Sequence, residues 1–175
     1  QIPISLAYQS IIMAVEGRHQ DEDELKANLF RALSHRKDDS VIELCNGTRD
    51  GPLYKMTLHD STVLHMACFL KNSDLANILL DKLFNASSSE DELLENISRA
   101  QNSWGNTVLH DAVTSKKGIP FVMKLLNKVP DLIVVRNRWG ESPLLQAIRY
   151  GRKHKMYLFL VEEVRKYCES HDYDL

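Results

Sequence analysis

The chain lacks the features that mark several classes of protein. Its three cysteines are odd in number and show no CxxC spacing, so we expect no disulfide framework and a reducing compartment. No apolar run approaches the roughly 18 residues that a membrane-spanning helix needs. Lysine plus arginine number 22 and aspartate plus glutamate 24, and this near balance is unlike the basic excess of a dedicated nucleic-acid binder.

Sequence motifs of catalysis and of cofactor binding are also missing. The chain contains no HExxH, GxGxxG or P-loop sequence. Cys168 and His171 make one short ligand pair, which is too little for a zinc site. The segment Ser170-His171-Asp172 holds the residue types of a catalytic triad, but adjacent side chains cannot converge in the geometry of a triad. We therefore predict a protein that is not an enzyme, with no catalytic residues, no metal site and no cofactor.

What the chain does contain is an internal repeat. The segment Asn102–Ala112 recurs 35 residues later as Asn137–Ala147. Upstream, Thr62–Ala67 repeats the second half of this segment, and Ala27–Ala32 is a fainter copy. A second apolar stretch follows each copy at a nearly constant distance, so the chain is expected to repeat one structural unit.

Hydrophobic spacing predicts that this unit consists of two short helices. Leu75, Ile78, Leu79 and Leu83 follow the i, i+3, i+4, i+8 spacing of a helix with one apolar face. Asp74 precedes that run and is expected to cap the helix. Because one helix pair cannot bury its own apolar face, neighbouring pairs must stack side by side.

The residues in front of the first helix of each pair predict a cap and a tight turn. Thr107 and Ser142 are expected to cap the first helices of the third and fourth copies. Gly105 and Gly140 lie two residues earlier, where a tight turn often requires a positive φ. Asp60 takes the matching place in the second copy, and aspartate tolerates that conformation better than most residues.

These residues carry a resemblance to a known family. The sequence Thr-Val-Leu-His-x-Ala at residues 62–67 and 107–112, with Ser-Pro-Leu-Leu-x-Ala at residues 142–147, resembles the Thr-Pro-Leu-His-x-Ala signature of ankyrin repeats. The resemblance implies an all-α fold, an ankyrin-repeat solenoid of about four helix-turn-helix repeats with short hairpin fingers. In such repeats the signature histidines, here His65 and His110, bond to backbone and tie neighbouring turns together.

Two further segments are similar to one plant subfamily. They are Val129-Pro130-Asp131-Leu132-Ile133 and Trp104-Gly105-Asn106-Thr107. They resemble the ankyrin domains of plant membrane proteins with a C-terminal PGG domain, the accelerated-cell-death type, in which cytoplasmic repeats precede transmembrane helices. This resemblance implies a cytoplasmic module in plant defence signalling. It would be tethered to the cytoplasmic face of a membrane only through a segment outside these 175 residues.

The repeat register defines the expected organisation of the chain. We expect an N-terminal capping helix with a linker, four repeats and a tail, over residues 1–23, 24–58, 59–103, 104–138, 139–168 and 169–175. The second repeat carries an insert over 85–101, in which Ser89 to Glu92 reads as a capping box and predicts an extra short helix. Residues 4–16 show helical apolar spacing, and this helix either caps the first repeat or docks to another chain.

Ankyrin-type arrays bind partners through their finger tips and the solvent face of each first helix. The resemblance therefore implies partner-binding roles for His59, Ser61, Phe69, Leu70, Ser103, Trp104, Asn106, Thr114, Ser115, Arg138, Trp139, Glu141, Arg149 and Tyr150. Exposed tryptophan, tyrosine and arginine dominate interface energies. The alternative for the two tryptophans is that each covers its own hairpin.

Two functions follow from this sequence. The first is a non-catalytic module that binds another protein through its concave face and binds no nucleic acid. The alternative is a structural module that self-associates into an oligomer through its terminal repeats.

Overall fold

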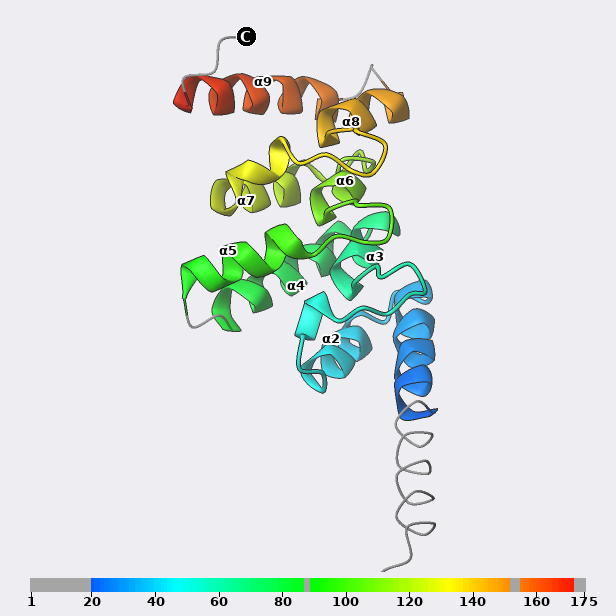
Figure 1. The fold of residues 1–175 in the computed structure, drawn as a ribbon. Coiled ribbons are helices and arrows are strands. Elements are labelled where there is room, and N and C mark those ends of the chain that lie inside the picture. The colour runs from blue at the N-terminus through cyan, green and yellow to red at the C-terminus, as the bar shows by residue number, and fades with distance from the viewer. Residues whose placement is uncertain (1–19, 87–88, 152–154, 172–175) are drawn as a thin grey trace, which may run out of the picture.

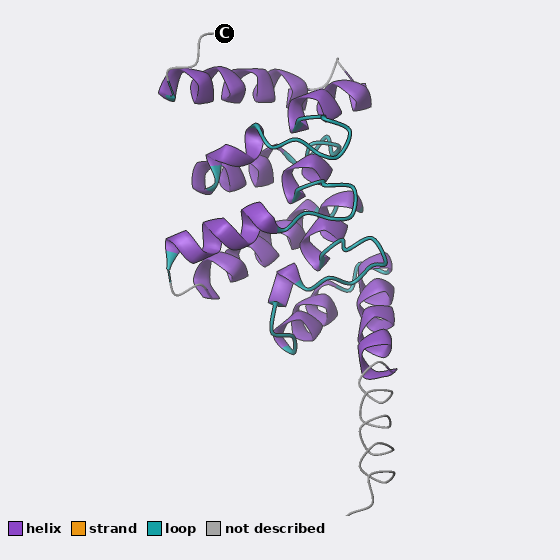
Figure 2. Ribbon diagram, viewed as in Figure 1, coloured by secondary structure: helices purple, strands orange, loops and turns teal. Residues whose placement is uncertain are grey.

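The fold is built from helices joined by turns and loops. The computed structural model describes residues 20–86, 89–151 and 155–171. Within these ranges the chain forms α-helices and two short 3-10 helices, and the only extended pairing is two isolated bridges, Lys55 with Thr62 and Gln101 with Thr107 (Figure 2). The all-α class expected from the sequence is confirmed.

The helices are arranged as pairs that stack in chain order (Figure 1). Helices α3 (Val63–Phe69), α6 (Val108–Ala112) and α8 (Pro143–Gly151) form one layer, with α3 against α6 and α6 against α8. Each is paired with a longer partner in a second layer, which holds α4 (Ser73–Ala86), α7 (Ile119–Lys128) and α9 (Lys155–Ser170). The stack begins with a helical segment over residues 20–34 and α2 (Asp38–Asn46).

Short elements complete the second layer. The 3-10 helix η1 (Gly51–Leu53) lies against α2, α3 and α4, and η2 (Pro130–Ile133) lies against α7 and α9. Helix α5 (Glu90–Arg99) packs on α4 within the insert, where Oγ of Ser89 accepts a hydrogen bond from the N–H of Glu92 at 3.2 Å. The extra helix expected there is confirmed, and Ile97 buries its apolar side.

Helix starts follow the expected capping residues in two cases and differ in one. Thr107 is the N-cap residue of α6, and Oγ of Ser142 accepts a hydrogen bond from the N–H of Leu145 at 3.4 Å. Thr62, which was not predicted as a cap, caps α3 through a hydrogen bond from the N–H of His65 to its Oγ1 at 3.3 Å. At α4, however, the cap is Asn72, whose Oδ1 accepts a hydrogen bond from the N–H of Leu75 at 3.3 Å. The assignment of that cap to Asp74 was wrong, because the helix begins at Ser73 and already includes Asp74.

The turns between the helix pairs adopt the backbone conformation that the sequence predicts. Gly105, Gly140 and Asp60 have φ values of 73°, 74° and 58°. The turns bond to one another through the backbone: the N–H of Ser103 donates to the carbonyl of His59 at 2.8 Å, and the N–H of Arg138 donates to the carbonyl of Trp104 at 2.9 Å. Successive turns therefore lie edge to edge along one side of the stack, and we call them fingers.

Buried histidines connect each helix pair to the finger of the next. Nε2 of His65 lies 3.2 Å from the carbonyl oxygen of Asn106, and Nε2 of His110 lies 3.0 Å from that of Glu141. The Nδ1 atom of each ring lies within 3.0 Å of the preceding threonine hydroxyl. Because Nδ1 also accepts a hydrogen bond from the threonine N–H, Nε2 carries the proton and donates to the next finger. The structural role implied for both histidines is confirmed.

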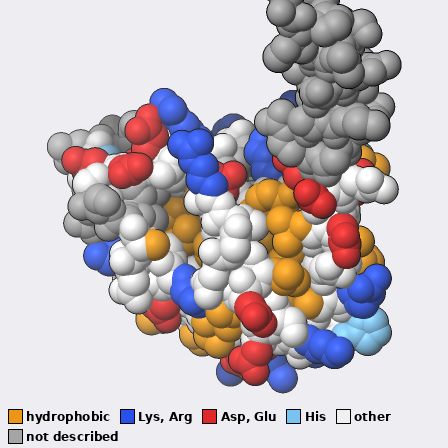
Figure 3. Space-filling model, turned by 90° about the horizontal axis from the view of Figure 1, so that it is seen from below, with side chains coloured by type: hydrophobic (Ala, Val, Ile, Leu, Met, Phe, Trp, Pro, Cys, Tyr) orange, Lys and Arg blue, Asp and Glu red, His pale blue; other side chains and the backbone are white. Residues whose placement is uncertain are grey.

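A continuous apolar core lies between the two layers. It contains Leu64, Leu79, Leu109, Leu125 and Leu160, which come from successive pairs and are all buried. The predicted stripe on α4 is buried except for Ile78, which is exposed. Seen from the N-terminal end of the stack, hydrophobic side chains lie among charged side chains of both signs (Figure 3), in keeping with the near balance of charge.

The ends of the chain differ from the expected boundaries. Residues 20–23, assigned to a linker, are helical and continuous with the helix that runs to residue 34. Helix α9 ends at Ser170, two residues into the expected tail. The helix predicted over residues 4–16 lies outside the described residues.

Candidate functional site

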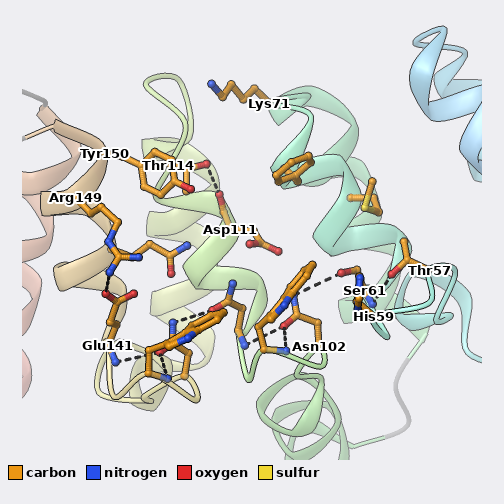
Figure 4. Close-up of a pocket in the computed structure, with 17 residues that line it drawn as sticks. Thr57, His59, Ser61, Lys71, Asn102, Asp111, Thr114, Glu141, Arg149 and Tyr150 are labelled. Carbon is orange, nitrogen blue, oxygen red and sulfur yellow. Dashed lines mark hydrogen bonds and ion pairs between the residues drawn. The ribbon is translucent and has the colours of Figure 1, made fainter.

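A groove runs along the fingers and the first layer of helices. It has a volume of about 540 Å³ and crosses three successive fingers together with α3, α6 and α8 (Figure 4). Its lining consists of Thr57, His59, Ser61, Met66, Phe69, Lys71, Asn102, Trp104, Asn106, Asp111, Thr114, Asn137, Trp139, Glu141, Gln146, Arg149 and Tyr150.

The first helices contribute one residue each from the same repeat position. Met66, Asp111 and Gln146 take the variable position directly before the alanine of each repeat signature, and all three line the groove. In α3 and α6 the preceding histidine bonds to the next finger, and one residue further the helix has turned by about 100°, which directs the side chain to the groove. Sequence reasoning missed these residues, although the variable position of the repeat signature carried the signal.

Aromatic side chains border the groove. Phe69, Trp139 and Tyr150 are exposed, and Trp104 is 39% exposed against 62% for Trp139. The ring of Trp104 lies against His59 of the preceding finger, with centroids 4.5 Å apart and planes inclined by 36°. The two tryptophans therefore differ, since Trp104 partly covers a finger whereas Trp139 presents most of its surface to solvent.

Asparagine side chains hold the fingers that carry these tryptophans. Oδ1 of Asn102 accepts hydrogen bonds from the N–H groups of Trp104 and Asn106 at 3.0 and 3.1 Å. Oδ1 of Asn137 accepts equivalent bonds from Trp139 and Glu141 at 3.0 Å each. Nδ2 of Asn137 donates to Oδ1 of Asn106 at 3.0 Å, which joins the two fingers. The groove wall is therefore fixed before any partner arrives.

Acceptor groups make up the floor of the groove. The Asp111 side chain belongs to a residue only 8% exposed, and burial raises the pKa of its carboxyl to about 7, against a smaller lowering by the hydrogen bond from Asn106. Gln146 is 7% exposed, and within the described part of the chain its Oε1 has no hydrogen-bond partner. Glu141 pairs with Arg149, and Lys71 lies at the opposite edge (Figure 4).

Of the residues expected to bind a partner, ten line this groove: His59, Ser61, Phe69, Trp104, Asn106, Thr114, Trp139, Glu141, Arg149 and Tyr150. Ser61 and Asn106 do so as buried residues of the finger network, since they accept hydrogen bonds from Nδ2 of Asn102 and of Asn137. Their side chains build the groove wall more than they present a binding surface.

Four of the expected residues lie outside the groove. Leu70 packs half-buried against the core, and Ser115 is buried in the turn beside Gly118. Ser103 contacts the previous finger through its N–H and, at 3.4 Å, through Oγ to Oδ2 of Asp60. Arg138 is exposed, and its backbone N–H is engaged by the carbonyl of Trp104.

Other ionisable groups of the described residues are held in structural positions. Burial lowers the pKa of His65 to about 4 and also lowers that of His110, so both rings stay neutral at physiological pH. Burial raises the pKa of Cys45 to about 11 and raises that of Cys68 well above its ordinary value, which suppresses the reactive thiolate. Among residues 20–86, 89–151 and 155–171 no group of three or more histidine, cysteine, aspartate or glutamate side chains is arranged to hold a metal ion.

The end of α9 brings Ser170 and His171 together in solvent. Oγ of Ser170 and Nδ1 of His171 lie 2.9 Å apart, and both also lie 2.9 Å from the carbonyl oxygen of Tyr167. Asp172 lies outside the described residues.

In the described ranges no helix is both long and apolar enough to cross a bilayer.

Comparison with known proteins identifies a shared fold. No family model and no curated protein matches the chain. A chain of the crystal structure of the yeast ribosomal protein Rps3 in complex with its chaperone Yar1 superposes with a TM-score of 0.66 at 21% sequence identity. The match covers 81% of this chain and 93% of that one. At this identity the likeness concerns the fold alone.

Proposed function

We propose that this chain is an ankyrin-repeat module that binds another protein through the groove and catalyses no reaction. The observation that supports it best is the groove itself, which crosses three successive fingers and is bordered by four aromatic side chains. Contiguous exposed apolar surface on a folded protein marks sites of contact with other molecules. Tryptophan, tyrosine and arginine, which line this groove, are the residues that dominate protein interfaces.

The rigidity of the groove supports the same proposal. The asparagine bonds and the finger-to-finger backbone bonds hold the wall without a partner. A surface fixed in advance loses little conformational entropy on binding, so more of its contact energy becomes affinity. The chain that shares this fold belongs to a crystal structure of a protein in complex with its chaperone, which agrees with a fold used for protein binding.

The assignment to ankyrin repeats is part of the proposal and rests on the signature sequences together with the stacked helix pairs and fingers. The plant setting, as a cytoplasmic recognition module for signalling at a membrane, rests on the two segments that resemble the accelerated-cell-death subfamily. The full-length sequence tests that setting, because a following multi-span segment would be required.

The binding proposal is tested by replacing an exposed groove residue. Partners captured by the whole chain and identified by mass spectrometry would be measured against Trp139→Ala and Arg149→Ala by calorimetry. We expect a loss of about 2 kcal/mol for Trp139→Ala, or about 30-fold in affinity. The matched control is Met123→Ala, a residue 47% exposed on α7 (Ile119–Lys128), outside the groove. Unchanged affinity in both groove variants, with circular dichroism showing native helix content, would refute the proposal.

One observation favours self-association as the second candidate function. Leu158 and Val161 are exposed on α9, the last helix of the stack, where no further pair covers them within the described residues. A Leu158→Glu variant should then lower the mass measured by light scattering from an oligomer to a monomer. A wild-type chain that is monomeric at high concentration rules this function out.

A further inference from the structure

The floor of the groove presents two buried acceptors from neighbouring helices. Asp111 lies on α6 and Gln146 on α8, and these helices contact one another. Both residues are more than nine-tenths buried, and both line the groove. Oε1 of Gln146 has no hydrogen-bond partner, and no ion pair is formed by Asp111, within the described residues. A buried acceptor without a donor costs free energy that a bound donor would recover.

The basic residues of the groove do not meet this need. Arg149 pairs with Glu141, and Lys71 lies at the far edge of the groove (Figure 4). The carboxyl of Asp111 lies between these two cations and pairs with neither. Asn106 supplies one hydrogen bond to that carboxyl, which leaves further acceptor positions on its oxygens. When the Asp111 carboxyl is ionised, the unmatched charge of the floor is therefore negative.

The walls suit a long side chain that ends in a cation. Phe69, Trp104 and Tyr150 offer apolar surface and ring faces to the space above the floor. Arginine and lysine bury apolar stems along such surfaces, and their charged ends interact favourably with aromatic faces. Only the guanidinium carries several donors in one plane, so that it can reach a carboxylate and an amide oxygen on adjacent helices together.

We propose that the groove takes an arginine side chain of the partner protein, which donates to the Asp111 carboxylate and to Oε1 of Gln146. This inference rests on the proposed function and specifies the chemistry of the partner. The acceptors on the floor select the guanidinium, and the aromatic wall selects the stem that carries it.

Arginine binding at this place is coupled to pH. A guanidinium favours the ionised carboxylate, so affinity rises as the pH increases through the pKa of Asp111, near 7. The groups around Asp111 that also carry or acquire charge are Cys68 behind it, His59 on the finger, Lys71 at the edge, and Glu141, Arg149 and Tyr150 toward α8. A comparison of the wild-type chain with Asp111→Asn isolates the contribution of Asp111 from theirs.

The test uses defined peptides and the two tryptophans of the chain. Trp104 and Trp139 are the only tryptophans, so two indole N–H signals in a nitrogen-15 spectrum report directly on the groove. The probes are acetyl-Gly-Arg-Gly-amide, its lysine counterpart, and its citrulline counterpart, which keeps the shape of arginine without the charge. We expect saturable shifts of both signals by the arginine peptide with a Kd on the order of 1 mM, and binding about tenfold weaker for the other two.

Asp111→Asn supplies the decisive variant because it keeps the shape of the side chain. We expect it to weaken arginine-peptide binding about tenfold at pH 8 and to abolish the rise in affinity between pH 6 and pH 8. Asp74→Asn, an exposed carboxylate on α4, is the matched control and should bind like the wild-type chain.

Three results would overturn the inference. They are equal binding of the citrulline or lysine peptide, arginine binding unchanged in Asp111→Asn, and no indole shift with any peptide at ten times the expected Kd. In the first two cases the indole shifts would still support the groove as a binding surface. The Trp139→Ala measurement on a captured protein decides the proposed function separately.

Discussion

Replacing Asp111 by asparagine should change the stability of this protein by an amount that depends strongly on pH. The carboxyl is buried on α6, and burial raises its pKa from 3.8 to about 7. Asparagine has nearly the same shape and cannot ionise. The substitution therefore removes the cost of ionising a buried group and leaves the packing in place.

The magnitude follows from proton linkage. Between pH 3.8 and pH 7 the folded chain keeps a proton on Asp111 that the unfolded chain has released, so this group's contribution to stability is present below pH 3.8 and is lost as the pH rises to 7. A shift of about three pKa units corresponds to about 4 kcal/mol. Relative to the wild-type chain, Asp111→Asn should therefore gain about 4 kcal/mol between pH 4 and pH 8.

Urea unfolding followed by circular dichroism, at pH 4 and at pH 8, measures this difference. Taking the difference between variant and wild type at each pH cancels the titration of all other carboxylates. Asp74→Asn, exposed in the first turn of α4, should show no comparable dependence on pH. An Asp111→Asn effect that is the same at both pH values would show that Asp111 is ionised as easily as a surface carboxylate, and the reasoning would fail.

Three further predictions concern the fingers and the buried histidine. Gly140→Ala should cost about 1 kcal/mol in urea unfolding, because an alanine at φ of 74° is strained. No steric cost is added, since a Cβ there would meet no atom within 4 Å. Gly105→Ala should cost about 3 kcal/mol in the same assay, since its Cβ would also lie 2.9 Å from the backbone nitrogen of Arg138; equal costs would contradict the close approach. The folded-state pKa of His65 is about 4, below the 6.5 of the unfolded chain, so the contribution of this group to stability is present above pH 6.5 and is lost toward pH 4. His65→Gln should therefore reduce the acid-induced loss of stability by about 3 kcal/mol, and an unchanged loss would refute this role.

Features set by nearby residues were predicted correctly from the sequence. The positive φ of Asp60, Gly105 and Gly140 and the caps at Thr107 and Ser142 agree with the structure. The cap of α4 was misassigned, because both Asn72 and Asp74 are capping residues by type. The choice between them depended on Lys71, whose φ of 58° ends the preceding helix and leaves Asn72 at the start of the next.

The candidate site was predicted in part. The aromatic and arginine residues of the groove were found because finger positions and the solvent face of each first helix repeat at a regular spacing. Asp111 and Gln146 were missed, because an aspartate or glutamine in a short helix is ordinarily exposed. Their burial arises from tertiary packing, in which α6 and α8 lie against one another.

The sequence by itself determined the helices, their turns and their repeated order, because capping, left-handed turns and apolar spacing depend on residues within about four positions of each other. The tertiary structure decided which side chains meet across the stack. The groove joins residues from Thr57 to Tyr150, and its buried acceptors lie on α6 and α8, which pack against one another. The Asp111 carboxyl becomes hard to ionise because segments distant in the sequence exclude water from it. The residues next to it in the sequence do not predict this desolvation.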